Sequence, residues 1–579
     1  MDDSILEKAQ SWAEDPQFDD DFRNEISELI NHQKNEELID RFYKDLEFGT
    51  GGLRGIIGAG SNRMNIYTVR RATQGLADYL NEFYHDQGKK ISVVIAHDSR
   101  NFSDLFTKES ARVLAGNGIH VHVFSRLAPT PLLSFTVREL KAQAGIVITA
   151  SHNPPEYNGY KVSWADGSQV ISPHDIGIIN KVNSIVDFYK INLMGYQEGL
   201  EKNRIVIVPK EIEKKYLRKL AELSFGNLER NKSLGIVYTP LHGAGNQPVK
   251  DLLRMCGFES LRVVPEQEKP DGDFPTVSYP NPEELSALKL AIKTAKNSDQ
   301  LILATDPDAD RLGVMVRHQG EWVKLSGNQI GQLMLDYYLR KLKENDRLPP
   351  DGVYITTIVT SNLGKKIAAK YGIKTFETLT GFKYIGSLMR QLEEEGGGSF
   401  IFGTEESHGY LFGDFIRDKD GVMAAMIFSE LTAELYEQGR TPMDRIEELH
   451  REFGFHSDSL VSKTSKGHEG AGKIALVMSS LRKNPFKKLA GVRVIEIRDY
   501  LTQEVTYCQK QKVGEKIELP VSNVIAFYME DGSRITVRPS GTEPKIKFYF
   551  NLCGKEEELL KQRKIEYEEE FENLIENFI

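Results

Sequence analysis

The feature that most constrains the fold is an alternation of short apolar segments with longer amphipathic segments, from about residue 65 to about residue 440. Runs of β-branched residues predict buried strands, and strands that alternate with helical segments are typical of α/β domains with mixed or predominantly parallel sheets. A chain of 579 residues exceeds what one hydrophobic core supports, so we expect several domains. The predicted strands include 91–95, 144–148, 235–238, 301–303, 354–359 and 400–402.

The stretch from about residue 456 has a different pattern. Predicted strands at 492–497, 524–528 and 545–550 are joined by short turns such as Glu530-Asp531-Gly532, which indicates an antiparallel α+β domain. A helix closes the chain. Apolar residues at helical spacing are expected to face the core of this domain, namely Tyr567, Phe571, Leu574, Ile575 and Phe578.

Three of the predicted strands run directly into polar loops, at residues 149–153, 306–310 and 403–409. Three similar strand-to-loop units suggest a repeated α/β module. The first loop, Thr149 to Pro155, places a hydroxyl and an imidazole where a buried strand ends, which is the usual position for a ligand in α/β proteins. Ser151 is therefore the first candidate for chemistry, although a turn whose serine caps the next helix explains this segment alone equally well.

The second loop contains Asp306, Asp308 and Asp310. In an extended loop alternate side chains share one side, so the three carboxylates are expected to converge and to need a divalent cation. An EF-hand is excluded, because Arg311 and Arg317 replace the required glycine and glutamate. Magnesium fits better, and a solvated acidic turn is the alternative.

The third signal is the loop from Arg538 to Lys545, which contains Ser540-Gly541-Thr542. Successive backbone amides in such a turn can bind an anion, and arginine can donate two parallel hydrogen bonds to a phosphate. A plain type II turn between two strands is the alternative. The flanking cations Arg538 and Lys545 favour phosphate binding.

The amino-acid composition restricts the kinds of molecule that this protein is expected to bind. Lys and Arg number 74 and Asp and Glu 84, a net charge of -10, which argues against a general nucleic-acid-binding protein. Three scattered cysteines, Cys256, Cys508 and Cys553, predict reduced thiols and no disulfide framework. The sequence shows no leader-like N-terminus and no apolar run long enough for a membrane span, so we expect a soluble, cytoplasmic protein that binds small molecules.

Together the three loops predict a phosphoryl-transfer enzyme with a second phosphate site, as a mutase needs for a bisphosphorylated intermediate. The chain resembles the α-D-phosphohexomutase superfamily over nearly its whole length, and within it the long phosphoglucomutase-2/phosphopentomutase branch. The resemblance rests on motifs at 48–55, 149–154, 306–311, 380–383, 405–407, 417–421 and 538–545.

The resemblance implies three related α/β domains and a smaller C-terminal α+β domain similar to the TATA-binding-protein fold, all around one central cleft. The expected bounds are 1–205, with an N-terminal helical extension and a phosphoserine loop, then 206–322, 323–455 and 456–579.

It also implies roles for single residues. Ser151 would be the phosphoserine, and its phosphoryl group would share Mg²⁺ with Asp306, Asp308 and Asp310. The implied reaction interconverts α-D-glucose 1-phosphate and glucose 6-phosphate through glucose 1,6-bisphosphate. The residues expected to grip the transferring group are Arg54, His152, Lys161 and Arg311, and those expected to bind substrate are Lys383, Glu405, Ser407, Arg538, Ser540, Gly541, Thr542 and Lys545.

The proton transfer needs a base. We interpret Asn158-Gly159 as a tight turn that brings Lys161 toward Ser151, where surrounding cations would lower the pKa of the lysine. Lys419 is the second candidate base, and simple phosphate pairing is the alternative role for each lysine. Phe382 stands where some relatives carry a histidine, so Lys383 and Lys419 are alternatives for that role. Glu406 is expected to cap a helix.

Other functions are compatible with parts of this sequence pattern. Phosphopentomutase or phosphomannomutase activity would use the same mechanism. An aspartyl-phosphate hydrolase would use Asp306 as its nucleophile, but Asp310 stands where that class prefers threonine or valine. A noncatalytic sugar-phosphate sensor is a third alternative, and the glycine spacing argues against a dinucleotide oxidoreductase.

Overall fold

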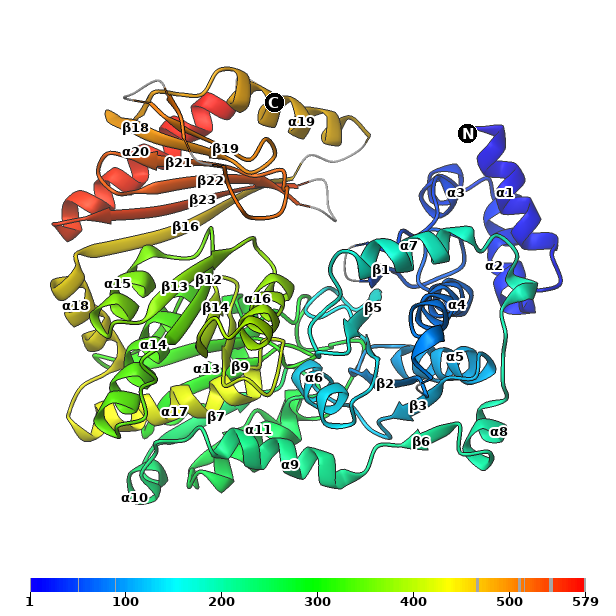
Figure 1. Cartoon of the computed structure of the whole chain (residues 1–579), viewed down its shortest axis with the longest axis horizontal. Coiled ribbons are helices and arrows are strands. Elements are labelled where there is room, and N and C mark those ends of the chain that lie inside the picture. The colour runs from blue at the N-terminus through cyan, green and yellow to red at the C-terminus, as the bar shows by residue number, and fades with distance from the viewer. Residues whose placement is uncertain are drawn as a thin grey trace. The chain divides into compact units, whose positions relative to one another are not determined.

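The computed structural model describes residues 2–49, 52–88, 90–464, 468–508, 512–514, 516–540 and 545–576. Contacts divide the chain into two compact units. Unit 1 contains residues 1–325, 382–403 and 407–439, and unit 2 contains residues 326–381, 404–406 and 440–579 (Figure 1).

Unit 1 begins with the expected helical extension, formed by α1 (Asp3–Glu14), α2 (Asp20–Asn31) and α3 (Asn35–Phe42). Its apolar side chains pack on the start of α4 (Ile66–Phe83). The rings of Trp12 and Phe18 stack with centroids 4.4 Å apart, and Phe18 meets Tyr67 of α4 edge-on at 4.7 Å. Burial of these large rings fixes the extension to the first sheet's helices.

The first sheet of unit 1 has the strand order β1-β5-β4-β2-β3-β6. Strands β2, β3, β4 and β6 pair in parallel, whereas β5 lies antiparallel between β1 and β4. The bounds are β1 (Gly52–Ile56), β2 (Ser92–His97), β3 (His120–Val123), β4 (Ala144–Ile148), β5 (Tyr157–Trp164) and β6 (Ile205–Ile207). The helices of this region are α5 (Ser103–Gly116), α6 (Thr130–Glu139), α7 (His174–Ser184) and α8 (Tyr196–Glu201), with short 3-10 turns η1 (His85–Gln87) and η2 (Phe188–Lys190).

The predicted tight turn at Asn158-Gly159 is wrong. Both residues lie inside β5, and the chain reverses between β4 and β5 through the Ser151 loop itself. Glycine is required at 159 because a Cβ atom there would lie 2.4 Å from the Thr149 carbonyl oxygen. The Asn-Gly pair thus marks a close approach of two backbones and not a hairpin.

The second sheet of unit 1 has the order β11-β10-β9-β7-β8. The parallel strands are β7 (Gly235–Thr239), β8 (Leu261–Val263) and β9 (Asp299–Thr305), and the antiparallel edge is formed by β10 (Leu312–His318) and β11 (Glu321–Lys324). The associated helices are α9 (Lys210–Ala221), α10 (Leu228–Lys232), α11 (Asn246–Met255), α12 (Pro265–Glu268) and α13 (Leu285–Thr294). Unit 1 also contains α16 (Phe382–Glu395), β15 (Gly409–Phe412) and the buried helix α17 (Gly421–Glu437).

Unit 2 contains a parallel pair, β12 (Gly352–Thr357) and β13 (Lys374–Thr378), with α14 (Gly327–Glu344), α15 (Asn362–Lys370) and α18 (Pro442–Phe453). Strand β14 (Ser399–Glu405) begins in unit 1 and ends in unit 2.

The C-terminal sheet of unit 2 is antiparallel, as predicted, in the order β16-β23-β22-β21-β18-β19-β20, with β17 beside β18. Its strands are β16 (Phe455–Thr464), β17 (Lys488–Leu489), β18 (Val492–Asp499), β19 (Glu504–Tyr507), β20 (Lys512–Val513), β21 (Ile525–Met529), β22 (Arg534–Pro539) and β23 (Lys545–Gly554). Helices α19 (His468–Lys483) and α20 (Glu557–Glu576) complete it. Tyr567, Phe571 and Ile575 are buried and Leu574 packs against them, as predicted, whereas Phe578 lies outside the described residues.

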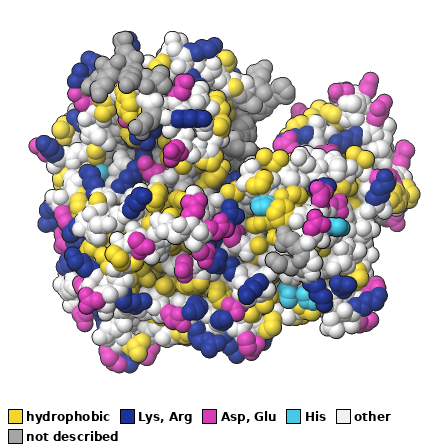
Figure 2. Space-filling model, viewed as in Figure 1, with side chains coloured by type: hydrophobic (Ala, Val, Ile, Leu, Met, Phe, Trp, Pro, Cys, Tyr) yellow, Lys and Arg dark blue, Asp and Glu magenta, His cyan; other side chains and the backbone are white. Residues whose placement is uncertain are grey.

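Charged side chains of both signs lie on the surface. On the face seen in Figure 2, Lys and Arg side chains of the described residues are interspersed with Asp and Glu side chains and form no continuous basic tract. Among the described helices, none combines the length and the apolar composition that a membrane crossing would require.

Candidate active site

Ser151 follows directly after β4, whose five residues are all buried. Its backbone has a φ of 53°, in the left-handed region that residues other than glycine seldom adopt. The Ser151 hydroxyl donates to Asp306 Oδ2 at 2.8 Å and lies 3.0 Å from His152 Nδ1. The first two predicted loops therefore meet at this hydroxyl.

The three aspartates converge as predicted, in a loop between β9 and β10. Their ligand atoms all lie within 4.8 Å of one another, and all three side chains are buried. The cause is a turn and not extended alternation, because Ala309 has a φ of 52° and its amide donates to the Asp306 carbonyl oxygen at 2.9 Å. Burial, together with the charges of Asp310 and Asp308, raises the pKa of Asp306 well above its usual value.

Two of these carboxylates retain unused acceptors. Oδ1 of Asp308 and Oδ1 of Asp310 are buried and accept no hydrogen bond within the part of the chain that the structure describes. A buried, unpartnered carboxylate oxygen is costly, and a hard divalent cation with oxygen ligands would satisfy both atoms. The donor set therefore fits a metal ion such as Mg²⁺.

Two lysines adjoin the aspartates. Lys161 Nζ lies 2.7 Å from Asp308 Oδ2 and 3.5 Å from Asp310 Oδ2, and Lys419 Nζ lies 2.8 Å from Asp310 Oδ2. The expected lowering of the Lys161 pKa is wrong for this arrangement. Burial favours a lower value, but the carboxylates of Asp308 and Asp310 outweigh it and raise the pKa of Lys161.

Cations and an imidazole border the Ser151 hydroxyl. Arg54 Nη1 donates to Asn153 Oδ1 at 3.4 Å, and the Arg311 guanidinium donates to Glu283 at 2.5 Å. Burial and the charges of Arg311 and Arg54 lower the pKa of His152 well below its usual value. His152 is therefore neutral at pH 7, while the two arginines supply the positive charge.

Unit 2 holds the third predicted loop. Arg538 lies near the end of β22, and the Ser540 amide donates to the Lys545 carbonyl oxygen at 2.7 Å, which closes the loop at its base. Gly541 and Thr542 lie outside the described residues.

Glu405 and Glu406 end their strand side by side with different partners. Glu405 Oε1 accepts from the Gly381 amide at 2.8 Å. The expected helix cap by Glu406 is wrong, because its carboxylate accepts from the hydroxyls of Thr357 and Thr360 at 3.2 and 3.3 Å. Burial raises the pKa of Glu406, and Lys547 and Arg538 oppose this.

The remaining substrate candidates belong to unit 1. Lys383 is the second residue of α16, with its ammonium group 5.1 Å from the ring centre of Tyr384. Ser407 lies between β14 and β15. The structure thus gathers Ser151, His152, Arg54, Lys161, Lys419, Arg311 and the aspartates in unit 1, and Glu405, Arg538, Ser540 and Lys545 belong to unit 2.

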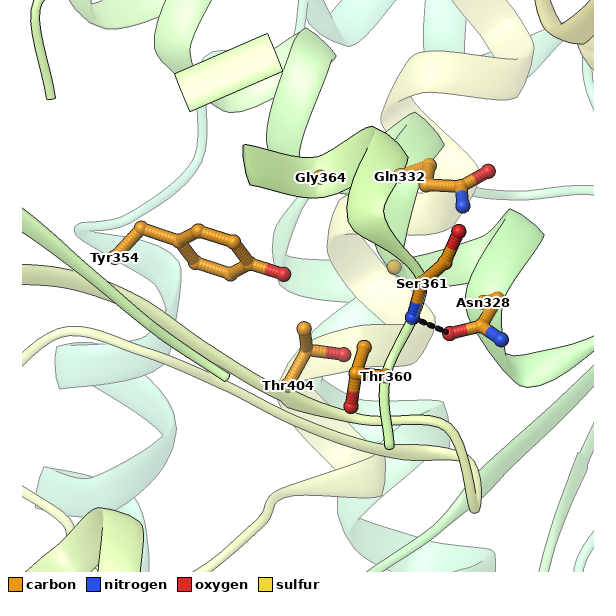
Figure 3. Close-up of a pocket in the computed structure, with 8 residues that line it drawn as sticks. Asn328, Gln332, Tyr354, Thr360, Ser361, Gly364 and Thr404 are labelled. Atoms are coloured by element: carbon orange, nitrogen blue, oxygen red, sulfur yellow. Dashed lines mark hydrogen bonds between the residues drawn. The ribbon is translucent and has the colours of Figure 1, made fainter. Parts of the chain in front are cut away.

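Sequence reasoning missed two buried arginines. Arg100 in unit 1 contacts the Ser151 loop, and Arg534 in unit 2 binds Glu377 Oε1 at 3.0 Å, the Thr360 carbonyl oxygen at 2.6 Å and Asn551 Oδ1 at 3.1 Å. Thr360 and Ser361 line a small polar pocket in which the Ser361 amide donates to Asn328 Oδ1 (Figure 3). The available signal for Arg100 was its place in the polar segment Asp98-Ser99-Arg100, shortly after the predicted strand 91–95, whereas Arg534 begins β22, which was not among the predicted strands.

The chain matches the models of four domains of one family. These are phosphoglucomutase/phosphomannomutase α/β/α domain I at residues 45–187, domain II at 214–320, domain III at 326–453 and the C-terminal domain at 486–568. A phosphoglucomutase from Staphylococcus haemolyticus is 38% identical over 513 residues, which cover 88% of this chain and 91% of the relative. A phosphoglucomutase from Staphylococcus aureus strain USA300 is 37% identical over 530 residues, 91% of this chain and 93% of the relative.

Solved structures show the same fold. The open form of pp63/parafusin, a phosphoglucomutase from Paramecium, aligns with a TM-score of 0.66 at 21% identity, covering 89% of this chain and 91% of that protein. A phosphoglucomutase/phosphomannomutase family protein from Burkholderia thailandensis aligns with a TM-score of 0.65 at 17% identity, covering 91% and 97%.

The chain therefore belongs to the phosphoglucomutase/phosphomannomutase family of the α-D-phosphohexomutase superfamily. It has the family's three α/β domains and C-terminal domain, and it is an enzyme, an isomerase of the phosphohexomutase class. The family assignment and the buried aspartate cluster agree on a metal-dependent mutase.

Proposed function

We propose that this enzyme interconverts α-D-glucose 1-phosphate and glucose 6-phosphate, with phospho-Ser151 as donor and acceptor of the phosphoryl group. The observation that supports this best is the Ser151 hydroxyl, 2.8 Å from Asp306, whose carboxylate clusters with those of Asp308 and Asp310, where two buried Oδ1 atoms have no hydrogen-bond partner among the described residues. The names of the Staphylococcus relatives supply the substrate. The proposed domain bounds are 1–205, 206–322, 323–455 and 456–579.

In the proposed cycle, phospho-Ser151 gives its phosphoryl group to the O6 hydroxyl of glucose 1-phosphate. The O–P bond at Ser151 breaks as the new bond to O6 forms, and glucose 1,6-bisphosphate and a free Ser151 hydroxyl result. After the intermediate turns over, the phosphoryl group on O1 returns to Ser151 and glucose 6-phosphate leaves. In each half of the cycle the accepting hydroxyl gives one proton to a base, and the oxygen that leaves phosphorus takes up one proton from a protonated group, so the number of protons is unchanged.

Asp306, Asp308 and Asp310 would hold Mg²⁺ together with an oxygen of the Ser151 phosphoryl group. When bound, the ion supplies positive charge against the charge that develops on the transferring group. Arg54 and Arg311 add fixed positive charge on the protein side, and neutral His152 is placed to hydrogen-bond Ser151 Oγ.

Lys161 and Lys419 are the proposed bases and phosphate ligands. Each lies against the aspartate cluster, at 2.7 and 2.8 Å from a carboxylate oxygen. A lysine held protonated by carboxylates acts first as a counter-charge, and it can take a proton only when those carboxylates are neutralised by another cation.

A second group of residues would bind the substrate away from the reacting phosphoryl group. Glu405 and Ser407 are proposed to accept and donate hydrogen bonds to adjacent sugar hydroxyls. Lys383 and the loop residues Arg538, Ser540, Gly541, Thr542 and Lys545 are proposed to bind the second phosphate.

The test is phosphoryl labelling. The enzyme is incubated with Mg²⁺ and labelled glucose 1,6-bisphosphate, and the labelled peptide is mapped. Acid-stable label on Ser151 is expected, with isomerisation of glucose 1-phosphate in the same preparation. Hydroxylamine-labile label on Asp306 would instead identify an aspartyl-phosphate hydrolase, and absence of label with retained sugar-phosphate binding would identify a sensor.

The preferred sugar is tested separately. Values of kcat/KM are compared for glucose 1-phosphate, mannose 1-phosphate and ribose 1-phosphate. We expect glucose 1-phosphate to give the highest value, and a higher value for either other substrate would reassign the specificity within the same mechanism.

A further inference from the structure

A buried arginine, Arg100, hydrogen-bonds the backbone of the Ser151 loop, and the proposed chemistry does not use it. Arg100 is 3% exposed. Its Nη2 donates to the carbonyl oxygens of Ser151, at 2.6 Å, and Asn153, and its Nη1 donates to those of Pro154, at 2.8 Å, and Tyr157, at 3.0 Å. One guanidinium thus binds four carbonyl groups of the chain that joins β4 to β5.

Convergence of these carbonyls on one cation determines the shape of the loop. Because a trans peptide places its N–H opposite its C=O, the His152 amide is directed away from Arg100. The peptide groups after Asn153 and Pro154 have no N–H, because residues 154 and 155 are prolines, so these two contacts with Arg100 fix the loop through its carbonyl groups alone.

Asp98 orients the arginine and extends the network to Ser151. Asp98 Oδ1 accepts from the Arg100 amide and from the Ser103 hydroxyl, both at 3.0 Å, and the Arg100 Nε lies 3.5 Å from Asp98 Oδ2. The same Oδ2 accepts from the Thr149 hydroxyl at 2.6 Å, and Thr149 Oγ1 in turn accepts from the Ser151 amide at 2.8 Å. A continuous chain of hydrogen bonds therefore runs from Arg100 to the backbone of Ser151.

The sheet explains why these residues meet. Strands β2 and β4 are parallel neighbours in which His97 is opposite Ile148. Asp98 and Thr149 are the next residue of each strand, so they leave the sheet side by side at the same edge. The side chains of Asp98 and Thr149 therefore meet because of the pairing of their strands.

This hydrogen-bond network stabilises a strained backbone conformation at Ser151. Ser151 has a φ of 53°, a conformation that costs a residue with a Cβ atom free energy unless its surroundings impose it. The Ser151 amide donates to Thr149 Oγ1, and the Ser151 carbonyl oxygen accepts from Arg100. These two contacts impose the conformation.

We propose that Asp98, Arg100 and Thr149 are positioning residues that hold Ser151 in its left-handed conformation and aim its hydroxyl at Asp306. This inference rests on the proposed function for its kinetic consequence. A loop released from the network moves the reacting oxygen, and a displacement of about 1 Å at a reacting centre lowers turnover by up to about 100-fold.

A matched pair of variants at Thr149 tests the proposal in the full-length enzyme. Thr149→Val keeps the β-branched shape but removes the hydroxyl, whereas Thr149→Ser keeps the hydroxyl. We expect Thr149→Val to lower kcat by about 10- to 100-fold with a KM for glucose 1-phosphate within about 3-fold of the parent. Thr149→Ser should recover kcat to within about 3-fold.

Crystal structures of both variants provide a readout that needs no substrate. In Thr149→Val the φ of Ser151 should leave the left-handed region or the Oγ–Asp306 distance should lengthen, and in Thr149→Ser neither should change. If the parent enzyme does not isomerise glucose phosphates, the proposed function is wrong, and these structures still decide the positioning role.

Ser103→Ala is the second variant, since it removes one donor to Asp98 and leaves Thr149 intact. Its kcat should fall in the same direction by about 3- to 10-fold. The proposal is overturned if Thr149→Val retains kcat, if Thr149→Val and Thr149→Ser lose kcat equally, or if Ser151 keeps its conformation without the Thr149 hydroxyl.

Discussion

Two buried arginines organise the two units in different ways. Arg100 donates to four backbone carbonyl groups within one loop of unit 1, so it fixes the shape of that loop. Arg534 joins three segments of unit 2, through Glu377 of β13, the Thr360 carbonyl after β12, and Asn551 of β23. Asn551 then donates to the Val359 carbonyl oxygen at 3.1 Å and to Asp458 at 2.9 Å.

The difference shows what each site requires. Phosphoryl transfer needs one oxygen in one orientation, so a cation that binds main-chain carbonyls of a single loop is sufficient. The proposed substrate-binding residues of unit 2 lie on several strands that must be held together, and Arg534 does this at the first residue of the strand that ends near Arg538. We therefore expect damage to unit 1 to affect kcat most, and damage to unit 2 to affect stability and KM.

The largest effect is expected at the reacting oxygen of unit 1. Ser151→Ala should lower kcat by at least about 10⁴-fold, because among the described residues no other side-chain hydroxyl hydrogen-bonds Asp306 and could carry the phosphoryl group between half-reactions. Steady-state kinetics and peptide mapping after treatment with glucose 1,6-bisphosphate measure the loss. Ser184→Ala, at an exposed helix end, is the control and should retain both activity and label on Ser151. Turnover by Ser151→Ala would show that another group carries the phosphoryl.

The next effect concerns the stability of unit 2. Arg534→Met fills a similar volume but removes the hydrogen bonds to Glu377, Thr360 and Asn551 and leaves Glu377 paired with Lys365, so the free energy of unfolding should fall by about 3 kcal/mol. Urea denaturation monitored by circular dichroism measures it. The control is Arg451→Met, because Arg451 is 67% exposed and its contact with Glu447 is 3.6 Å long. Equal effects of the two substitutions would contradict the role of Arg534 in holding three segments of unit 2 together.

A smaller effect is expected for substrate binding in unit 2. Arg538→Ala should raise KM for glucose 1-phosphate by about 10- to 100-fold and leave kcat within about 3-fold, because the arginine is proposed to bind the phosphate that does not react. Initial-rate kinetics separate the two constants. Arg493→Ala, an exposed arginine of the same sheet, should change neither. An unchanged KM for Arg538→Ala would remove this loop from the proposed binding site.

The smallest effect is a pH dependence of stability in unit 1. Burial raises the pKa of Asp420 to about 7, and its carboxyl caps α17 through the Met423 amide and accepts from Tyr216 Oη. Because the folded state holds this proton and the unfolded state releases it near pH 4, the Asp420 contribution to stability is complete below about pH 4. It falls by about 1.4 kcal/mol per pH unit as the pH rises toward 7.

Asp420→Asn keeps the cap and removes the ionisation. Its free energy of unfolding, measured by urea denaturation between pH 5.5 and 6.5, should decline by about 1 kcal/mol less than that of the parent over this interval. Parallel pH profiles for the two proteins would show that Asp420 does not titrate in this range.

Much of the architecture could be predicted from local pattern. The apolar runs at 144–148 and 301–303 lie in β4 and β9 because short β-branched runs bury well in a parallel sheet. The convergence of Asp306, Asp308 and Asp310 followed from their spacing, although a turn at Ala309 produces it. The Asn158-Gly159 pair led to a wrong prediction. This dipeptide is typical of a hairpin turn, but here it lies inside β5, where glycine permits the close approach of another backbone segment.

What the sequence by itself determined is the set of chemical groups and the strand ends on which they lie, since both depend on local composition and periodicity. Only the tertiary structure decided which groups meet. The pairing of β2 with β4 brings Asp98 beside Thr149, and the Ser151 and Asp306 loops meet across 155 residues of chain. These contacts depend on strand order and register, which no local pattern specifies, and they determine the conformation of Ser151 and the partner of its hydroxyl.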